Sequence, residues 1–420
     1  MPLVAFRPLR HRDFALLWSA SLVSNIGTWM ETVAVGSLIA RDTGRAAAVG
    51  AAAAAAFLPS ALLSPIGGLI SDRVHRKRFL LLTLGFDTAL AVVLAVLIAN
   101  GHRSPALLST ILFLEGCSGA LAMPNRQSLM PELVPRDELV AAVSLGSTAW
   151  NGGRVVGPAL AGILISAAGP TWAVVANAVS FAVMLVAATF IHLPERLPAR
   201  DGDTIRQRLA AGADAIRTRA DCRLGVILIV AIASTAAPFI GLIPIVARQV
   251  FGGGAGTTAL FVTAQGIGAI AGAIVAPTLA DRHGRERMIA GFMLGLPPSL
   301  VLYALSPTSA IASLALAVVG ACYMGVFAGA QALVQLGAPN HLKARVISLF
   351  SVALGMAYTV SVSVNGVLAD KFGLRQVHLL QAALTAAAVL LLAMRLPGWW
   401  RGDQVGSRVG EQLDGRTSTT

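Results

Sequence analysis

The chain has 420 residues, of which 56% are hydrophobic and 12% are charged, and its formal net charge is +12. The charged fraction is about half that of an average soluble domain, so a soluble protein of this composition would lack polar residues to cover its surface. Composition therefore excludes an ordinary soluble enzyme and predicts an all-α polytopic membrane protein.

Apolar segments recur along the chain, and each is long enough to cross a hydrocarbon core of about 30 Å. We predict twelve transmembrane helices, at 14–40, 46–70, 79–100, 105–127, 139–167, 171–192, 223–247, 257–280, 288–306, 309–335, 343–368 and 374–396. They form two six-helix halves, at 1–193 and 223–397. A cytoplasmic linker at 194–222, helical around 204–219, joins the halves, and a polar cytoplasmic tail at 398–420 is expected to be disordered.

The basic residues are distributed unevenly over the predicted loops. With the N-terminus inside, cytoplasmic segments carry 25 Lys or Arg and external loops carry 6. The positive-inside rule then places both termini in the cytoplasm, and the net charge needs no nucleic-acid partner. Arg outnumbers Lys by 29 to 3, as in GC-rich bacterial genomes, so we expect a multi-pass protein of the bacterial inner membrane.

A short basic turn occurs twice, each time between two long apolar segments. The copies, at 68–78 and 277–287, lie 209 residues apart, and each contains an Asp-Arg pair followed by further basic residues. A turn repeated half a chain later predicts a duplicated membrane protein. Parallel six-helix repeats are a known transporter plan, with the substrate site between the halves near the bilayer midplane.

The two turns resemble motif A of the major facilitator superfamily, G-x-x-x-D-R/K-x-G-x-R/K-R/K. The first copy has His75 where Gly is usual, and the second has Pro277 for the first Gly and Glu286 for one base. The segments 14–29 and 124–135 resemble the enterobactin-exporter-like and drug-efflux group of that superfamily. The resemblance implies a twelve-helix secondary transporter.

Within the superfamily, motif A packs the cytoplasmic ends of the two halves together. Asp72 would face the N-terminus of the helix starting near Leu342, where a partial positive charge favours a carboxylate. Alternatively, these charges only set the topology. Because the second copy is eroded, gating is expected to depend mainly on the first. The implied gating residues are Gly68, Asp72, Arg73, Arg76, Lys77, Arg78, Asp281, Arg282 and Arg285.

A glycine pattern in the fifth predicted helix resembles motif C, which accompanies antiporters in the superfamily. Gly153, Gly157 and Gly162 recur at spacings that allow close helix contact, and Pro158 introduces a kink. Ala161 replaces one Gly of the motif. The resemblance implies export rather than uptake. The alternative is a tight helix crossing without directional meaning.

Four charged residues fall well inside predicted spans, away from their ends: Glu31, Asp87, Glu115 and Arg154. Buried charges are costly in a membrane, so such residues are functional candidates that pair or face a cavity. We expect Glu31 to pair with Arg154 and rank Glu31, Glu115 and Asp87, in that order, as proton-coupling residues. Asp87 is also a candidate partner of the motif A bases, and structural pairing is the alternative for all four. Glu115 lies four residues before Gly119, where motif B of the superfamily carries an Arg, so the chain lacks motif B as usually written.

Polar and aromatic residues within the spans are candidates to line a substrate cavity, although helix packing uses the same residue types. They are Asn25, Trp29, Trp150, Gln265, Tyr323, Gln331, Tyr358 and Asn365. The C-terminal half has almost no charge within its spans, which predicts a permissive apolar wall. Such a cavity favours amphipathic cargo over sugars or phosphates.

The chain contains no GxSxG, HExxH or P-loop motif, so we expect neither an enzyme nor an ATP-driven pump, and no cofactor. Cys117, Cys222 and Cys322 lack metal-ligand spacing, and no metal site is expected. The leading hypothesis is a monomeric secondary transporter that exports a siderophore or drug-like compound by proton antiport with alternating access. The alternatives are an importer or facilitator on the same fold, and a transport-inactive scaffold or sensor.

Overall fold

The computed structural model describes residues 6–192, 205–339 and 342–395, and within these ranges the chain is helical with no strand. The N-half begins with a short 3₁₀ helix and comprises η1 (Arg7–Arg10), α2 (Arg12–Thr43), α3 (Ala46–Arg73), α4 (Arg76–Ala99), α5 (Pro105–Glu132), η2 (Arg136–Glu138), α6 (Leu139–Ala168) and α7 (Pro170–Phe190). A connecting helix, α8 (Ile205–Thr218), follows. The C-half comprises α9 (Ala220–Thr235), α10 (Pro238–Gln249), α11 (Ala255–His283), α12 (Arg285–Leu305), α13 (Ser309–Gly337), α14 (Lys343–Phe372) and α15 (Leu374–Arg395).

The prediction of twelve membrane-crossing helices is confirmed for the described residues. Ten segments are long and apolar enough to cross a membrane, and α9 with α10 counts as one of them. The other two, α2 and α6, have the length but are less apolar. These two helices carry the buried charges Glu31 and Arg154, which lower their hydropathy.

The predicted continuous helix at 223–247 is broken between α9 and α10. The amide nitrogens of Ala236 and Ala237 both donate to the Ile232 carbonyl at 2.9 Å, so the regular ladder stops there. Pro238 follows directly and has no amide hydrogen to continue it. The seventh membrane segment is therefore two short helices joined by a bend.

The predicted helix within the linker forms as α8 and packs against α14. Gly212 lies against α14, where an added Cβ would be 2.9 Å from the Leu349 side chain. The residues at 193–204 and the predicted tail at 398–420 lie outside the described ranges. The proposed domain limits stay predictions.

The two halves meet along two antiparallel helix pairs, α3 with α14 and α6 with α11. Backbones approach closely in the first pair. A Cβ at Gly50 would lie 2.7 Å from the Val362 carbonyl oxygen, and one at Gly366 would lie 2.8 Å from the Ala46 carbonyl oxygen. Farther along the pair, a Cβ at Gly355 would lie 2.8 Å from the Ala61 Cβ. Small residues thus bring the halves into direct contact, as in other membrane helix pairs.

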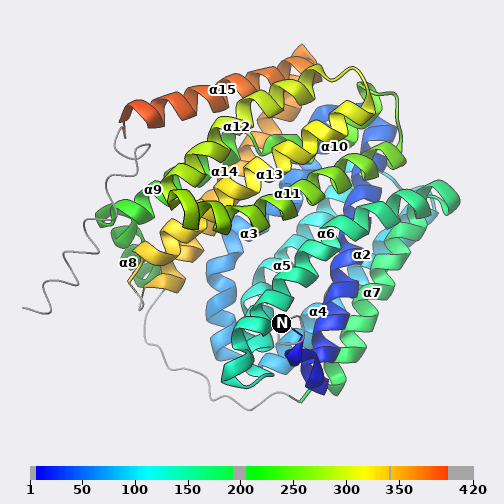
Figure 1. Cartoon of the computed structure of the whole chain (residues 1–420). Helices are drawn as coiled ribbons and strands as arrows, with labels where there is room; N and C mark the ends of the chain where they lie inside the picture. The colour runs from blue at the N-terminus through cyan, green and yellow to red at the C-terminus, as the bar shows by residue number, and fades with distance from the viewer. Residues whose placement is uncertain (1–5, 193–204, 340–341, 396–420) are drawn as a thin grey trace, which may run out of the picture.

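The two ends of the bundle differ. We call the end where α2 leads into α3 and α14 leads into α15 the closed end, and the end where α7 leaves and α8 lies the linker end. At the closed end, Gly44 adopts a φ of 59°, which ends α2 and lets α3 start two residues later. In Figure 1 the ribbons of the two halves come together at the closed end and spread apart toward the linker end.

Candidate functional site

A cluster of three carboxyl groups lies inside the N-half and involves Glu31 on α2, Asp87 on α4 and Glu115 on α5. Glu31 and Asp87 are buried, at 3% and 4% exposure. The carboxyl groups of Glu31 and Glu115 lie within hydrogen-bonding reach of each other. Two ionised carboxylates have no hydrogen to share, so a hydrogen bond between them forms only when one of them is protonated. We call these three residues the acid cluster.

Asn177 on α7 fixes the orientation of Glu31. Its Nδ2 donates to Glu31 Oε2 at 2.8 Å, and Ser180 Oγ donates to Asn177 Oδ1 at 3.2 Å. The two hydrogen bonds determine which side of the amide faces the acid. Gly27 makes the approach possible, because a Cβ there would collide with Ser180 Oγ.

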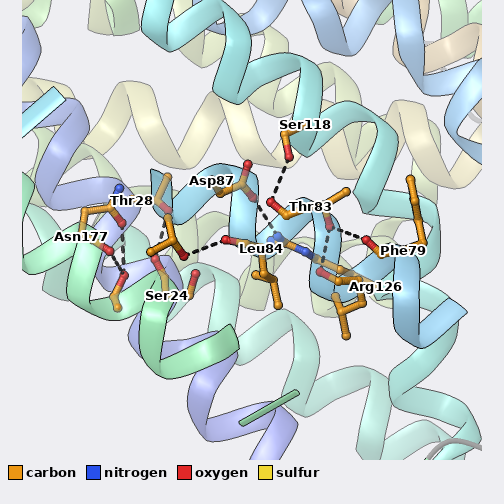
Figure 2. Close-up of polar contacts among 12 residues, drawn as sticks. Ser24, Thr28, Phe79, Thr83, Leu84, Asp87, Ser118, Arg126 and Asn177 are labelled. Carbon is orange, nitrogen blue, oxygen red and sulfur yellow. Dashed lines mark hydrogen bonds and ion pairs between the residues drawn. The ribbon is translucent and has the colours of Figure 1, made fainter. Parts of the chain in front are cut away.

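Asp87 is paired with Arg126 of α5, whose Nη2 lies 3.2 Å from Asp87 Oδ2 (Figure 2). Ser118, also on α5, is close by and donates to the Thr83 carbonyl at 3.5 Å. The alternative, a pairing of Asp87 with the motif A bases, is not seen for the bases whose side chains are described. The cluster thus contains three carboxyl groups against one guanidinium, so full ionisation would leave an excess of buried negative charge. Protonation is the ordinary way for buried acids to relieve such an excess.

Arg154 faces the other half. Its Nη2 donates to Gln265 Oε1 on α11 at 2.8 Å, and its guanidinium carbon lies 5.6 Å from the centre of the Trp29 ring. The expected ion pair between Glu31 and Arg154 is wrong. Trp29 and Glu31 are two residues apart on α2, about 200° around the helix, so they face opposite sides. We call Trp29, Arg154 and Gln265 the central donor cluster.

Aromatic residues surround the central donor cluster. Trp150 meets the Trp29 ring edge-on with centroids 6.4 Å apart, and 46% of Trp150 is exposed. The hydroxyl of Tyr323 lies near Arg154, and Tyr358 lies near Tyr323. Tyr358 also packs against Phe57 of α3 at a centroid distance of 4.9 Å.

The remaining cavity candidates occupy different places. Asn25 lies where α2 meets α6, against Gly153. Gln331 is partly buried on α13. Asn365 belongs to the interior of the C-half and not to the contact between halves.

A chain of neutral polar groups runs through the C-half, and the sequence reasoning missed it. His378 Nδ1 lies 3.1 Å from Gln381 Oε1, and Gln381 Nε2 donates to Asn365 Oδ1 at 3.1 Å. Asn365 Nδ2 then donates to Ser361 Oγ at 3.3 Å, and Ser361 Oγ donates to the Ser234 carbonyl. We call this the C-half network. It links α15 through α14 to the last turn of α9, beside the bend before α10. A His and a Gln three residues apart in an apolar helix were the available signal.

The motif C glycines lie in tight helix contacts. A Cβ at Gly153 would be 2.7 Å from Asn25 Cβ, and one at Gly157 would be 2.6 Å from the Ile26 carbonyl oxygen. At Gly162 the contact is with Ala259 of the C-half, at 2.7 Å. Pro158 is buried among them. The pattern therefore brings α6 against both α2 and α11, and its link with export stays a prediction.

Two bases of the first motif A copy, Arg76 and Lys77, contact the N-half itself. Arg76 Nη1 binds Glu132 Oε1 at 2.6 Å, at the end of α5. Lys77 Nζ donates to the carbonyls of Thr189 and Ile191 at 2.7 and 2.8 Å, next to the negative end of the α7 dipole.

The other predicted gating residues lie near the ends of α3, α4, α11 and α12. Arg78 is exposed, and its amide lies 3.5 Å from the His75 ring nitrogen. In the second copy, Asp281 and Arg282 are exposed and Arg285 begins α12. Gly68, Asp72 and Arg73 lie in the last part of α3, and their side chains are outside the described set.

A carboxylate of the C-half holds the closed end. Asp370 Oδ1 accepts from the Ala46 amide at 2.6 Å, and Oδ2 accepts from the Ala47 amide at 3.1 Å. Arg45 Nε lies 3.8 Å from the same carboxylate. The acid at the end of α14 therefore caps the N-terminus of α3, where free amides and the helix dipole favour negative charge. We call Asp370 with Ala46 and Ala47 the Asp370 latch, which sequence reasoning did not anticipate.

Comparison with known proteins defines the class. The family model described as "Transmembrane secretion effector" (MFS_3) matches residues 3–414. The chain belongs to this family, and the resemblance to the major facilitator superfamily is confirmed. Its family and fold are those of membrane transporters and not of enzymes.

Three relatives and one solved structure illustrate the match. The chain is 29% identical to the uncharacterized MFS-type transporter YfiS of Bacillus subtilis, over 46% of this chain and 45% of that one. It is 23% identical to the Staphyloferrin A transporter of Staphylococcus aureus, over 66% of this chain and 71% of that one. It is 22% identical to Macrolide efflux protein A of Streptococcus pyogenes, over 91% and 95%. The nucleoside transporter NupG has the same fold, with a TM-score of 0.73 at 11% identity over 91% of this chain and 98% of that one.

Proposed function

We propose that this protein is a secondary active transporter that exports a small amphipathic molecule, a siderophore or drug-like compound, in exchange for protons. The observation that carries the proposal is the contact between the Glu31 and Glu115 carboxyl groups within the acid cluster. One shared proton turns a repulsive contact into a hydrogen bond. Loss of that proton drives the acids apart, so proton binding and helix position are linked at this place.

Alternating access is supported by the difference between the two ends of the bundle. The positive-inside rule assigns the linker end to the cytoplasm. With the Asp370 latch formed at the closed end, the described conformation then faces inward. At the opposite end of the same antiparallel pair, Asp72 is proposed to face the N-terminus of α14 when the cytoplasmic side closes. Each half would thus offer a carboxylate to a helix of the other half.

Export of amphipathic cargo is supported by the motif C glycines and by the named relatives, which include a staphyloferrin A transporter and a macrolide efflux protein. The acid cluster and the central donor cluster lie on opposite faces of α2. A shift of α2 on proton binding would therefore change the position of Trp29 relative to Arg154. This arrangement gives one helix contact with both the coupling proton and the cargo.

The test uses inverted inner-membrane vesicles with an imposed pH gradient and a panel of labelled siderophores and drugs. Accumulation driven by interior acid is expected for the cargo. Movement that ignores the gradient would favour a facilitator, and accumulation driven by interior alkali would favour an importer. A panel without any movement, in vesicles shown to contain the folded protein, would favour a scaffold or sensor.

A further inference from the structure

We propose that the central donor cluster binds a carboxylate group, and that the carboxylate belongs to a ligand with an aromatic or apolar body. The inference deepens the proposed export function, and rests on it only in treating this ligand as the cargo. Three buried nitrogens of the cluster carry the proposal: Trp29 Nε1, Arg154 Nε and Gln265 Nε2 have no hydrogen-bond acceptor among the residues that the structure describes.

The chemistry of the cluster is that of hydrogen-bond donors. Each unpartnered atom carries a hydrogen, and buried donors without an acceptor are rare in folded proteins. Arg154 is 9% exposed, and its described neighbours are Gln265, Trp29 and Tyr323, none of them an acid. A guanidinium inside a membrane is costly without a counter-charge. An anionic ligand supplies both the missing charge and the missing acceptors.

The geometry of Arg154 favours a planar pair of oxygens. Nε and Nη2 form the side of the guanidinium that binds a carboxylate through two parallel hydrogen bonds. Gln265 Oε1 now occupies Nη2 at 2.8 Å, and Nε is unpartnered. A carboxylate that displaces the Gln265 oxygen would take both positions, and the Gln265 amide would be free to donate to the same ligand.

The aromatic pair beside the cluster suits the rest of the ligand. Trp29 and Trp150 meet edge-on, and the exposed part of Trp150 offers an apolar face one turn before Arg154. A cationic amine would be repelled by Arg154, and α2 keeps the acid cluster on its other face. The site therefore selects amphipathic anions over amphipathic cations.

Binding at this cluster would act on both halves. The hydrogen bond from Arg154 to Gln265 joins α6 of the N-half to α11 of the C-half. A carboxylate that takes both nitrogens of Arg154 releases this contact and replaces it with one that runs through the ligand. Ligand binding would therefore replace a direct hydrogen bond between the two halves with contacts that both halves make to the ligand.

The experiment measures binding by calorimetry to the full-length protein in lipid nanodiscs, with three matched probes. 1-Naphthoate is the anion, 1-naphthamide the neutral isostere and 1-naphthylmethylamine the cation. We expect naphthoate to bind about tenfold or more tightly than naphthamide, as charge-assisted hydrogen bonds imply, and the amine to bind weakest. Equal affinity for naphthoate and naphthamide, or no binding of naphthoate at millimolar concentration, would overturn the proposal.

Two variants and a control locate the site. Arg154→Gln should lose the preference for naphthoate. Gln265→Glu should lose it too, because it places a carboxylate on Arg154 from within the protein, and it should raise thermal stability. Arg103→Gln, at a loop arginine of the closed end, should keep the wild-type preference. A preference that survives Gln265→Glu in a folded protein would contradict the assignment even if Arg154→Gln fails to fold.

The outcome is separable from that of the proposed function. Binding in nanodiscs needs no gradient, whereas the vesicle assay needs one. Proton-driven export of neutral or cationic compounds alone, with no preference for naphthoate, would refute this inference and leave the export function standing. Selective binding of naphthoate without gradient-driven transport would support this inference and refute the export function.

Discussion

The two halves have the same helical plan but bury different kinds of polar group. The N-half holds the acid cluster with Arg126, which together contain three carboxyl groups and one guanidinium. The C-half holds a chain of amides, hydroxyls and one imidazole, which runs to the bend between α9 and α10. The carboxyl groups that we propose to gain and lose protons are concentrated in one repeat, and groups that brace a broken helix are concentrated in the other. If the proposed function holds, the two repeats share one scaffold, with proton coupling in the first and a bent helix in the second.

The largest effect is expected from a variant that removes the proton proposed to be shared by Glu31 and Glu115, and it tests the role given to the N-half. Glu31→Gln should abolish gradient-driven accumulation in inverted vesicles, because the amide can neither release nor take up a proton at the Glu115 contact. Gradient-independent exchange of cargo should persist, since the central donor cluster is untouched. Both are measured as labelled-cargo flux with and without interior acid.

The matched control for this variant is Glu286→Gln, which removes a buried acid of the C-half. It should retain the wild-type response to the gradient. Loss of coupling in Glu286→Gln and retention in Glu31→Gln would reverse the assignment of roles to the halves.

A second test concerns Arg126, the cation that is paired with Asp87 of the acid cluster. Arg126→Gln leaves Asp87 without its partner, and breaking a buried ion pair from one side costs about 3 kcal/mol or more. We expect a lower thermal midpoint and reduced amounts of folded protein. Adding Asp87→Asn should restore much of the stability, because the pair is then neutral on both sides. A double variant no more stable than Arg126→Gln would show that Arg126 acts on something other than Asp87.

Both halves contribute to the third test, which compares the two ends of the α3–α14 pair. Asp370→Asn removes the charge that caps α3, an interaction of about 1 kcal/mol, so the population open at the closed end should rise about fivefold. Asp72→Asn should shift the population in the opposite direction. Spin-label distances across the closed end, between the α2–α3 and α10–α11 loops, measure both.

Asp42→Asn serves as the control for these variants, because Asp42 lies at the closed end but is bound to Arg41 next to it in the chain. Its distance distribution should match the wild type. If Asp370→Asn and Asp72→Asn shift the populations in the same direction, the two carboxylates are not opposing latches.

The architecture could be read from the sequence because hydropathy and charge bias act locally, whereas the partners of buried groups depend on rotation and depth. The span predicted to stop at 127 continues as α5 to Glu132, so Arg126 lies more than one turn before the end of the helix, where it meets Asp87. The predicted pair of Glu31 and Arg154 does not form, because the face of α2 that is turned toward Arg154 carries Trp29 and not Glu31. The partners of Asp370 lie more than 320 residues away in the chain, at Ala46 and Ala47, and no local pattern reveals them.

The smallest expected effect concerns His378, the titratable member of the C-half network. His378→Gln keeps a donor for Gln381 but loses the packing of the imidazole on the Tyr303 ring, whose centroid lies 5.1 Å away. We expect a modest loss of stability, about 1 kcal/mol, measured by thermal unfolding in detergent. The pH profile of transport should match the wild type, because the proton-linked carboxyl groups lie in the N-half. A displaced profile in this variant would show that an imidazole of the C-half takes part in coupling, and the division between the repeats would then be wrong.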